Sequence, residues 1–194
     1  MVHIPTVATV AVIGAGAVGR AIAHRAALGG YRTILEDILP ASLRKAESEI
    51  CAHLLQAAEQ GSVSQADAES VLRRLEYVGT VEAAARQADL VIEAVPDEME
   101  SKLEIFTLLD KICRPHTILA STTTSLSVSE IASITYRPRK ILGMRFLQPV
   151  AELKLQLVRA RETDDETMAA CAEVGRRMCD EVAVIAEASA SKSN

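Results

Sequence analysis

The chain has 194 residues, of which 49% are hydrophobic and only 3% aromatic, and it contains no tryptophan. This length is enough for one well-buried domain and too short for two large ones, and the core must be built from Ala, Val, Ile and Leu. The formal net charge of −5 argues against general nucleic-acid binding, which needs a basic face.

The termini, the cysteines and the apolar runs suggest a cytoplasmic protein. Residues 1–5 have no basic region and no long apolar stretch, so we expect no secretion signal. No apolar run approaches the ~18 residues of a membrane-spanning helix. The four cysteines form no C-x-x-C pattern and have no histidine at metal-ligand spacing, which predicts buried or incidental thiols in a reducing compartment and no metal site.

Strands and helices are predicted to alternate along the chain. The expected strands are 7–13, 31–35, 76–78, 89–95, 117–120, 140–146, 153–159 and 182–186. The expected helices are 17–29, 41–60, 64–75, 81–87, 99–111, 127–132 and 167–179, the last preceded by a capping box at 163–166. This order predicts an α/β fold of the Rossmann type, a doubly wound and mostly parallel sheet with helices on both faces. One domain is expected over residues 1–187, followed by a disordered tail at 188–194.

The first strand leads into the pattern G-x-G-x-x-G and then into a helix. Gly14 lets the strand turn sharply, Gly16 lets a pyrophosphate approach the backbone, and Gly19 lets helix and strand pack closely. The free N–H groups at the start of the helix face the anion. The residues expected at the dinucleotide are Gly14, Ala15, Gly16, Ala17, Val18 and Gly19. A tight turn without a ligand is the alternative.

An acid at the tip of the second strand supports the dinucleotide interpretation. In this architecture a carboxylate there accepts hydrogen bonds from the adenosine ribose and repels a 2′-phosphate, so NAD is favoured over NADP. Of the two adjacent acids we choose Asp37, because Glu36 falls within the strand alternation.

Four motifs together resemble the NAD-binding domain of the L-3-hydroxyacyl-CoA dehydrogenases, over about residues 7–187. They are VAVIGAG at 10–16, DLVIEAVPD at 89–97, ILASTTTSLS at 118–127 and GMRFLQPV at 143–150. The resemblance implies NAD as the cofactor and, in intact members, oxidation of a 3-hydroxyacyl-CoA to the 3-ketoacyl-CoA.

Most cofactor positions of the family carry over. Asp97 and Lys102 fall where the family has an acid and a lysine near the cofactor, and Thr122 replaces an asparagine. The alternative for Asp97 and Lys102 is an acid at a helix start and a solvated lysine.

The catalytic positions do not carry over. Arg145 occupies the place of the family's general base, a histidine that takes the hydroxyl proton, and arginine cannot be neutral near pH 7. Leu157 occupies the place of the glutamate that orients this histidine. Thr124 stands for a serine that binds the substrate oxygen, and it keeps the hydroxyl. Arg145 either polarises a carbonyl or holds a carboxylate at the nicotinamide, or it points to solvent or pairs with an acid.

The family's last strand leads into an all-helical domain that closes the acyl-CoA site, whereas here residues 188–194 follow. We therefore expect a second copy or a partner chain to cover the exposed face. Three functions remain open: an NAD-binding homologue with impaired dehydrogenase activity, a working oxidoreductase on an acyl-CoA or small hydroxy acid completed by another chain or domain, and a non-enzymatic NAD-responsive interaction module.

Overall fold

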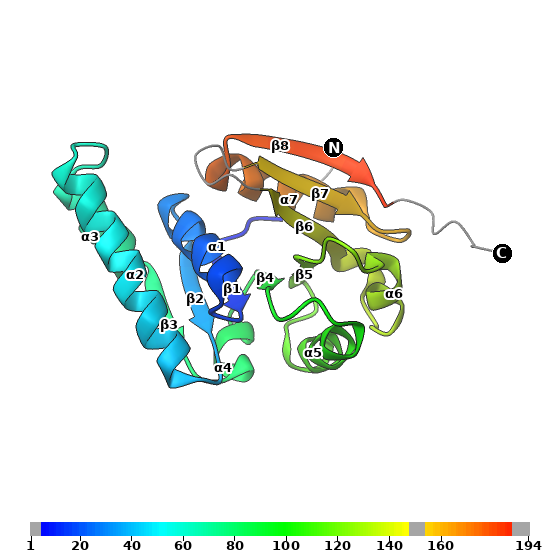
Figure 1. Ribbon diagram of the computed structural model, residues 1–194. Coiled ribbons are helices and arrows are strands. Elements are labelled where there is room, and N and C mark those ends of the chain that lie inside the picture. Colours follow the sequence, from blue (N-terminus) through cyan, green and yellow to red (C-terminus); the bar gives the residue numbers. More distant parts are fainter. Residues whose placement is uncertain (1–4, 148–153, 188–194) are drawn as a thin grey trace.

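The computed structural model describes residues 5–147 and 154–187. Within them one sheet has the strand order β3-β2-β1-β4-β5-β6-β7-β8 (Figure 1). The strands are β1 (Thr9–Ile13), β2 (Arg32–Glu36), β3 (Leu75–Val78), β4 (Leu90–Glu93), β5 (Ile118–Ser121), β6 (Ile141–Leu147), β7 (Lys154–Arg159) and β8 (Glu181–Ala186). The helices are α1 (Ala17–Leu28), α2 (Pro40–Glu59), α3 (Gln65–Arg73), α4 (Val81–Ala85), α5 (Met99–Ile112), α6 (Val128–Ser133) and α7 (Asp165–Met178), with a short 3₁₀ turn η1 (Pro138–Lys140).

The first six strands of the chain run parallel, and β7 and β8 run in the opposite direction. β6 and β7 pair antiparallel, with Met144 opposite Leu157 and Arg145 opposite Gln156. β7 and β8 pair parallel to each other. The predicted doubly wound, mostly parallel sheet is therefore confirmed.

Helices cover both faces of the sheet, and each face has its own apolar core. On one face α1 and α7 pack against side chains such as Val12 and Leu157. On the other face α4, α5 and α6 pack against Ile13, Val91 and their neighbours. The pair α2 and α3 extends to one side and has a small core of its own against Ala27 of α1 (Figure 1). As the composition requires, these cores are largely aliphatic.

The predicted elements agree with the structure to within about two residues at each end. Two details differ. The η1 turn was not predicted, and the helix at α7 is capped differently: the side chain of Asp164, not Thr163, accepts the N–H of Thr167. Thr163 is used elsewhere, since its hydroxyl donates to the carbonyl of Ile141. The predicted tail at 188–194 and the end of the 143–150 motif lie outside the described residues.

The parallel strands bring the sequence motifs together at one edge of the sheet. The glycine loop follows β1, Asp37 follows β2, Asp97 follows β4, and Thr122 to Thr124 follow β5. Because the carboxyl ends of parallel strands meet at the same edge, four motifs far apart in sequence surround one crevice.

Candidate functional site

The three glycines of the loop between β1 and α1 have the geometry that their predicted tasks require. Gly14 has a φ of +102°, and a Cβ there would lie 2.8 Å from the carbonyl oxygen of Ala94. A Cβ on Gly19 would lie 1.8 Å from the carbonyl oxygen of Gly14. A Cβ on Gly16, in contrast, would meet no atom within 4 Å. The loop is therefore tightly packed at its ends and open at the position where a phosphate would approach.

Helix α1 begins directly after this opening. Gly16 is its N-cap and supplies no side-chain cap, and its first turn contains no acid. The first N–H groups of a helix have no partner within it and carry partial positive charge, so they favour an anion. Arg20 links the loop to α2, because its guanidinium donates to the carbonyl of Ala15 and pairs with Glu49 at 2.9 Å.

Asp37 ties the second strand to the glycine loop. One carboxylate oxygen accepts the N–H of Ala15 at 2.9 Å, and the other accepts the N–H of Leu39 at 2.9 Å. The carboxylate is half-buried and has lone pairs left to accept further hydrogen bonds. Its contact with Ala15 fixes the position of this carboxylate relative to the glycine loop.

Lys102 is not the solvated lysine considered as an alternative. Its side chain is fully buried, and its Nζ lies 2.7 Å from Glu93 Oε1 and 3.6 Å from Asp97 Oδ1. Glu93 also accepts the hydroxyl of Ser121 at 2.7 Å and the N–H of Val95 at 2.8 Å. These contacts join the ends of β4 and β5 to α5 beneath the crevice.

Asp97 lies at the solvent-exposed end of the same network. Its burial favours a higher pKa, but hydrogen bonds from Thr123 and Ser125 and the charge of Lys102 outweigh it, and the pKa of this carboxyl is lowered. Asp97 is therefore a carboxylate at neutral pH, and its side chain is more than a third exposed. An acid in this state can accept a hydroxyl of a bound ligand.

A cavity of about 860 Å³ joins these groups. It runs from the end of β2 past the glycine loop to the loop after β5. Of the residues predicted to contact a cofactor, its lining includes Gly14, Gly16, Ala17, Val18, Asp37, Asp97, Lys102 and Thr122. Ala15 and Gly19 are not part of the lining, since Ala15 is buried and Gly19 lies in the helix–strand contact. The size is typical of a site for a small molecule or cofactor.

Thr124 links this cavity to a second hollow of about 710 Å³, which Arg145 also lines. Arg145 is half-buried, and its Nε donates to the carbonyl of Thr123 at 2.9 Å. Among the described residues no carboxylate lies within ion-pair distance of Arg145. Arg145, which occupies the family's base position, is thus attached to the loop that carries the exposed residue Thr124.

Arg145 and Leu157 lie on opposite faces of the sheet. In the β6–β7 register Leu157 is opposite Met144, and both are fully buried in the core on the α1 and α7 side. Arg145 is opposite Gln156, which is half-buried. Because neighbouring side chains in a strand alternate between faces, a glutamate at 157 in this register would not meet the side chain at 145.

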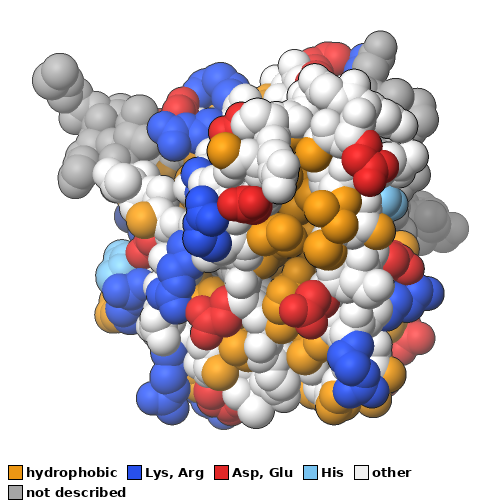
Figure 2. Space-filling model, turned by 90° about the vertical axis from the view of Figure 1, so that its left-hand side faces the viewer, with side chains coloured by type: hydrophobic (Ala, Val, Ile, Leu, Met, Phe, Trp, Pro, Cys, Tyr) orange, Lys and Arg blue, Asp and Glu red, His pale blue; other side chains and the backbone are white. Residues whose placement is uncertain are grey.

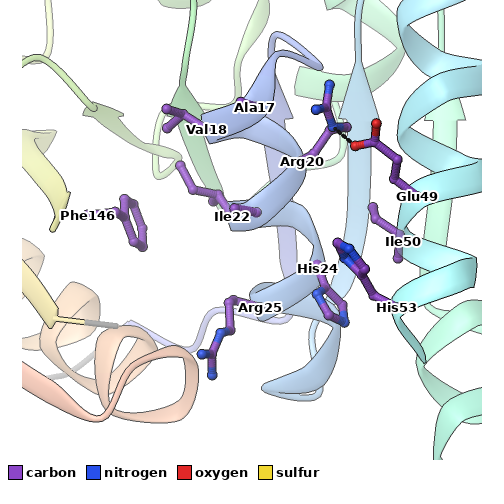
Figure 3. A pocket seen from close by; sticks show the side chains of 11 residues that line it. Ala17, Val18, Arg20, Ile22, His24, Arg25, Glu49, Ile50, His53 and Phe146 are labelled. Atoms are coloured by element: carbon purple, nitrogen blue, oxygen red, sulfur yellow. Dashed lines mark ion pairs between the residues drawn. The ribbon is translucent and has the colours of Figure 1, made fainter. Parts of the chain in front are cut away.

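A third hollow of about 300 Å³ lies between α1 and α2 (Figure 3). His24 and His53 line it, and their ring centroids are 6.4 Å apart. Burial, reinforced by the charges of His53 and Arg25, lowers the pKa of His24 to about 4. His24 is therefore neutral near pH 7. Phe146 lines both this hollow and the large cavity, so the two adjoin there.

Several residues of the site were not predicted from the sequence. They are Glu93 and Ser121 of the buried network, Glu36, Val81 and Ile105 of the cavity wall, and the pair His24 and His53. A signal existed for Glu93, because an acid inside a continuous apolar strand needs a partner. For Glu36 the signal was the pair of adjacent acids at the end of the strand, of which we choose Asp37. For the others no local pattern in the chain indicates that they belong to the site.

Comparison with known proteins identifies the family. The family model described as the NAD-binding domain of 3-hydroxyacyl-CoA dehydrogenase matches residues 9–189. The chain belongs to this family of NAD-binding, Rossmann-type dehydrogenase domains. The cofactor predicted from the glycine loop and Asp37 is the one in the family's description.

Curated relatives and solved structures agree. A "Probable 3-hydroxybutyryl-CoA dehydrogenase" of Bacillus subtilis is 40% identical over 80% of this chain and 54% of its own. A 3-hydroxyadipyl-CoA dehydrogenase of Escherichia coli is 36% identical over 90% of this chain and 35% of its own. The crystal structure of a 3-hydroxybutyryl-CoA dehydrogenase from Escherichia coli K12 superposes with a TM-score of 0.90 at 31% identity, over 94% of this chain and 39% of its own. The chain thus spans about half or less of the length of these relatives.

The described residues contain neither of two other functional features. No helix there combines the length and apolarity needed to cross a membrane. No group of three or more His, Cys, Asp or Glu side chains within 5–147 and 154–187 is arranged to hold a metal ion.

Proposed function

We propose that this chain binds NAD(H) in the cavity at the carboxyl ends of β1, β2, β4 and β5. The observation that carries this proposal is the glycine loop, which is open at Gly16, followed by the uncapped N-terminus of α1. The pyrophosphate would lie on these N–H groups, and Asp37 would accept the adenosine ribose hydroxyls. Asp97 and Thr122, in the wall of the same cavity, would contact the nicotinamide half.

We further propose that the chain does not catalyse the family's dehydrogenation at a rate comparable to its relatives. When bound, NAD supplies the hydride acceptor, and the protein must supply a base for the hydroxyl proton. Arg145 occupies the base position, and a guanidinium stays protonated at every physiological pH. Thr124 keeps a hydroxyl that can bind a substrate oxygen, but Leu157 is buried on the other face and cannot assist. Loss of a positioned base costs about 10²–10⁴ in rate.

Two measurements test these statements separately. Calorimetric titration with NAD should give binding. Mixing the protein with NAD and 3-hydroxybutyryl-CoA should give NADH absorbance at a rate at least ~10² below that of the Escherichia coli 3-hydroxybutyryl-CoA dehydrogenase. Binding without turnover supports both proposals. Turnover within about tenfold of the relative's rate contradicts the impaired activity, and the absence of NAD binding contradicts the cofactor site.

A fusion separates the effect of Arg145 from that of the chain's length. This chain would be joined to the part of the Bacillus subtilis relative that lies beyond the matched region. The unmodified fusion should stay inactive, whereas Arg145→His with Gln156→Glu, two positions that face each other across the ladder, should raise turnover by about 10² or more. An active unmodified fusion would show that Arg145 supports catalysis.

A specific observation also supports an interaction function, the second candidate. Val18, Ile38 and Leu39 line the large cavity and are 46%, 76% and 58% exposed. Apolar side chains also gather on the side of the molecule that carries α2 and α3 (Figure 2). We propose that a second copy of this chain or another polypeptide covers the cavity rim that Val18, Ile38 and Leu39 form. Sedimentation analysis should show self-association that Ile38→Glu with Leu39→Glu abolishes, and a monomer at all concentrations would contradict a homo-oligomer.

A further inference from the structure

Glu36 is a buried carboxyl in the wall of the proposed dinucleotide cavity. It is the last residue of β2 and is only 2% exposed, yet it belongs to the cavity lining. Its Oε1 has no hydrogen-bond partner among the described residues. A buried polar atom without a partner is unfavourable in a folded protein, so its position facing a cavity suggests that a ligand completes it.

The surroundings of Glu36 define one end of the cavity. Asp37, the next residue, marks the place of the adenosine ribose, and the loop with Thr124 lies at the opposite end of the lining. The remaining wall near Glu36 is apolar and comes from the loop after β2, the start of α4, the loop after β4 and α5. It consists of Ile38, Val81, Val95 and Ile105. A slot with apolar walls next to a ribose site suits a flat purine base, and Glu36 is the polar group in it.

The charges around Glu36 oppose its ionisation. Burial, together with the neighbouring charges of Asp37 and of Glu82 on α4, raises the pKa of its carboxyl to about 7. The cations and acids elsewhere in the cavity wall are Lys102 and Asp97, and Lys102 is already paired with Glu93 at 2.7 Å. Near neutral pH a substantial share of Glu36 is therefore the uncharged acid.

We infer that Glu36 binds the adenine base of the dinucleotide and does so as the neutral carboxylic acid. This inference rests on the proposed NAD binding. Adenine presents ring nitrogens that accept hydrogen bonds and an amino group that donates. A neutral carboxyl group can donate through its O–H and accept through its C=O, whereas a carboxylate only accepts. The neutral form thus matches both kinds of adenine atom, and it avoids a third negative charge beside Asp37 and Glu82.

The inference predicts a pH dependence with a definite sign. Below pH 7 Glu36 is protonated, and the dinucleotide binds without a proton change. Above pH 7 binding requires uptake of one proton, so the dissociation constant should rise by up to about tenfold per pH unit. Ligand-bound protein should hold its proton to higher pH than free protein does.

The test is calorimetric titration of the full chain with NAD and with ADP-ribose between pH 6 and 9. Above pH 7 the dissociation constants should rise by ~10-fold per pH unit. ADP-ribose lacks nicotinamide, so a shared pH profile places the titrating group at the adenosine end. Repeating the titration at pH 8 in buffers of different ionisation enthalpy should report close to one proton taken up.

Two variants separate a ligand contact from a structural role. Glu36→Gln keeps the shape and both kinds of hydrogen-bonding atom, and it should bind NAD with an affinity that no longer changes from pH 6 to 9. Glu82→Gln does not line the cavity but removes a charge near Glu36. It should leave the affinity at pH 6 unchanged and move the midpoint of the profile to lower pH. A merely structural Glu36 would produce neither effect.

The outcomes that overturn the inference are distinct. Affinity that is constant with pH in the parent chain, or that improves as pH rises, excludes binding through the neutral acid. An unchanged pH profile in Glu36→Gln assigns the titration to another group. If neither NAD nor ADP-ribose binds at any pH, the proposed cofactor site itself is wrong and the inference fails with it.

Discussion

Two glycines of the loop have different roles: Gly19 is needed for folding, and Gly16 leaves space for a ligand. Gly19 is needed because a side chain would overlap the carbonyl of Gly14, whereas the space beside Gly16 is open. The same substitution at the two positions therefore has different physical consequences, although both residues belong to one motif.

Gly19→Ala should destabilise the fold, and Gly16→Ala should mainly weaken binding of the dinucleotide. The methyl group of Gly19→Ala forces the loop or helix to move, which costs about 1–3 kcal/mol of unfolding free energy. Gly16→Ala has room in the free protein and should cost about 1 kcal/mol or less, but its methyl group lies where the pyrophosphate would approach. Urea unfolding and NAD titration check the two effects, and equal stability of both variants would contradict the packing argument.

Lys102 matters for stability as well as for the cavity. Lys102→Met leaves the carboxylate of Glu93 buried without its partner, and we expect a loss of about 3–5 kcal/mol in the free energy of unfolding. Lys111→Met on the same helix is the matched control, because Lys111 is exposed, and it should change stability by less than ~0.5 kcal/mol. Adding Glu93→Gln to Lys102→Met should recover part of the loss, and a failure to do so would exclude charge burial as its cause.

At the scale of elements, the β6–β7 ladder decides what the catalytic substitutions mean. The antiparallel register places Arg145 toward the α6 side and Leu157 toward α1 and α7. Exchanging Leu157 for an acid would therefore introduce a charge into the core rather than restore a catalytic pair.

Leu157→Glu should be strongly destabilising, by about 3 kcal/mol or more, because it buries an unpaired carboxylate or forces it to stay protonated. Its neighbour in the β7–β8 register, Val184, lies on the same face but is 57% exposed. Val184→Glu should therefore change stability by less than ~1 kcal/mol. Thermal unfolding of both variants checks the difference, and comparable melting temperatures would show that the core boundary is misplaced.

The elements themselves could be predicted from the sequence, and their mutual contacts only in part. Apolar periodicity and helix capping act locally, and in the structure the side chains of Ser64 and Thr80 accept the N–H groups of Asp67 and Ala83. The pairing register is not local. The resemblance to the family indicated Arg145 and Leu157 as a lost pair, but only the ladder shows that Gln156 is the residue opposite Arg145.

The same limit applies to the site. The glycine loop and Asp37 could be predicted because each follows a strand whose end is visible in the sequence. Whether Lys102 is solvated or buried depends on Glu93, nine residues earlier, and on how closely β4 and α5 pack. The environment of Glu36 depends on α4 and α5, which lie far along the chain.

At the scale of the whole molecule, the cysteines report on global stability. Cys113, Cys171 and Cys179 are buried, and burial raises their pKa values to about 11, 12 and 11. Only Cys51 of the four is partly exposed. The native protein should therefore react quickly with one equivalent of a thiol reagent, and the other three should react only after unfolding.

Cys51→Ser should abolish the fast phase, and denaturant should make the remaining thiols reactive together in one cooperative step. Fast labelling of two or more sites in the native state would contradict the burial of these side chains.

The position of β4 has a consequence for synthesis on the ribosome. β4 pairs with β1, about 80 residues earlier, and the N–H of Ala94 donates to the carbonyl of Ile13 at the start of the glycine loop. The backbone of Ala94 also forms the surface against which Gly14 turns. A nascent chain that has emerged only as far as α3 contains the entire glycine motif and β2 but lacks β4, the other strand that contacts the loop. The cofactor loop is therefore completed by a long-range contact, and the nucleotide can act as a folding ligand only after about the first half of the chain, through Ala94, has left the tunnel.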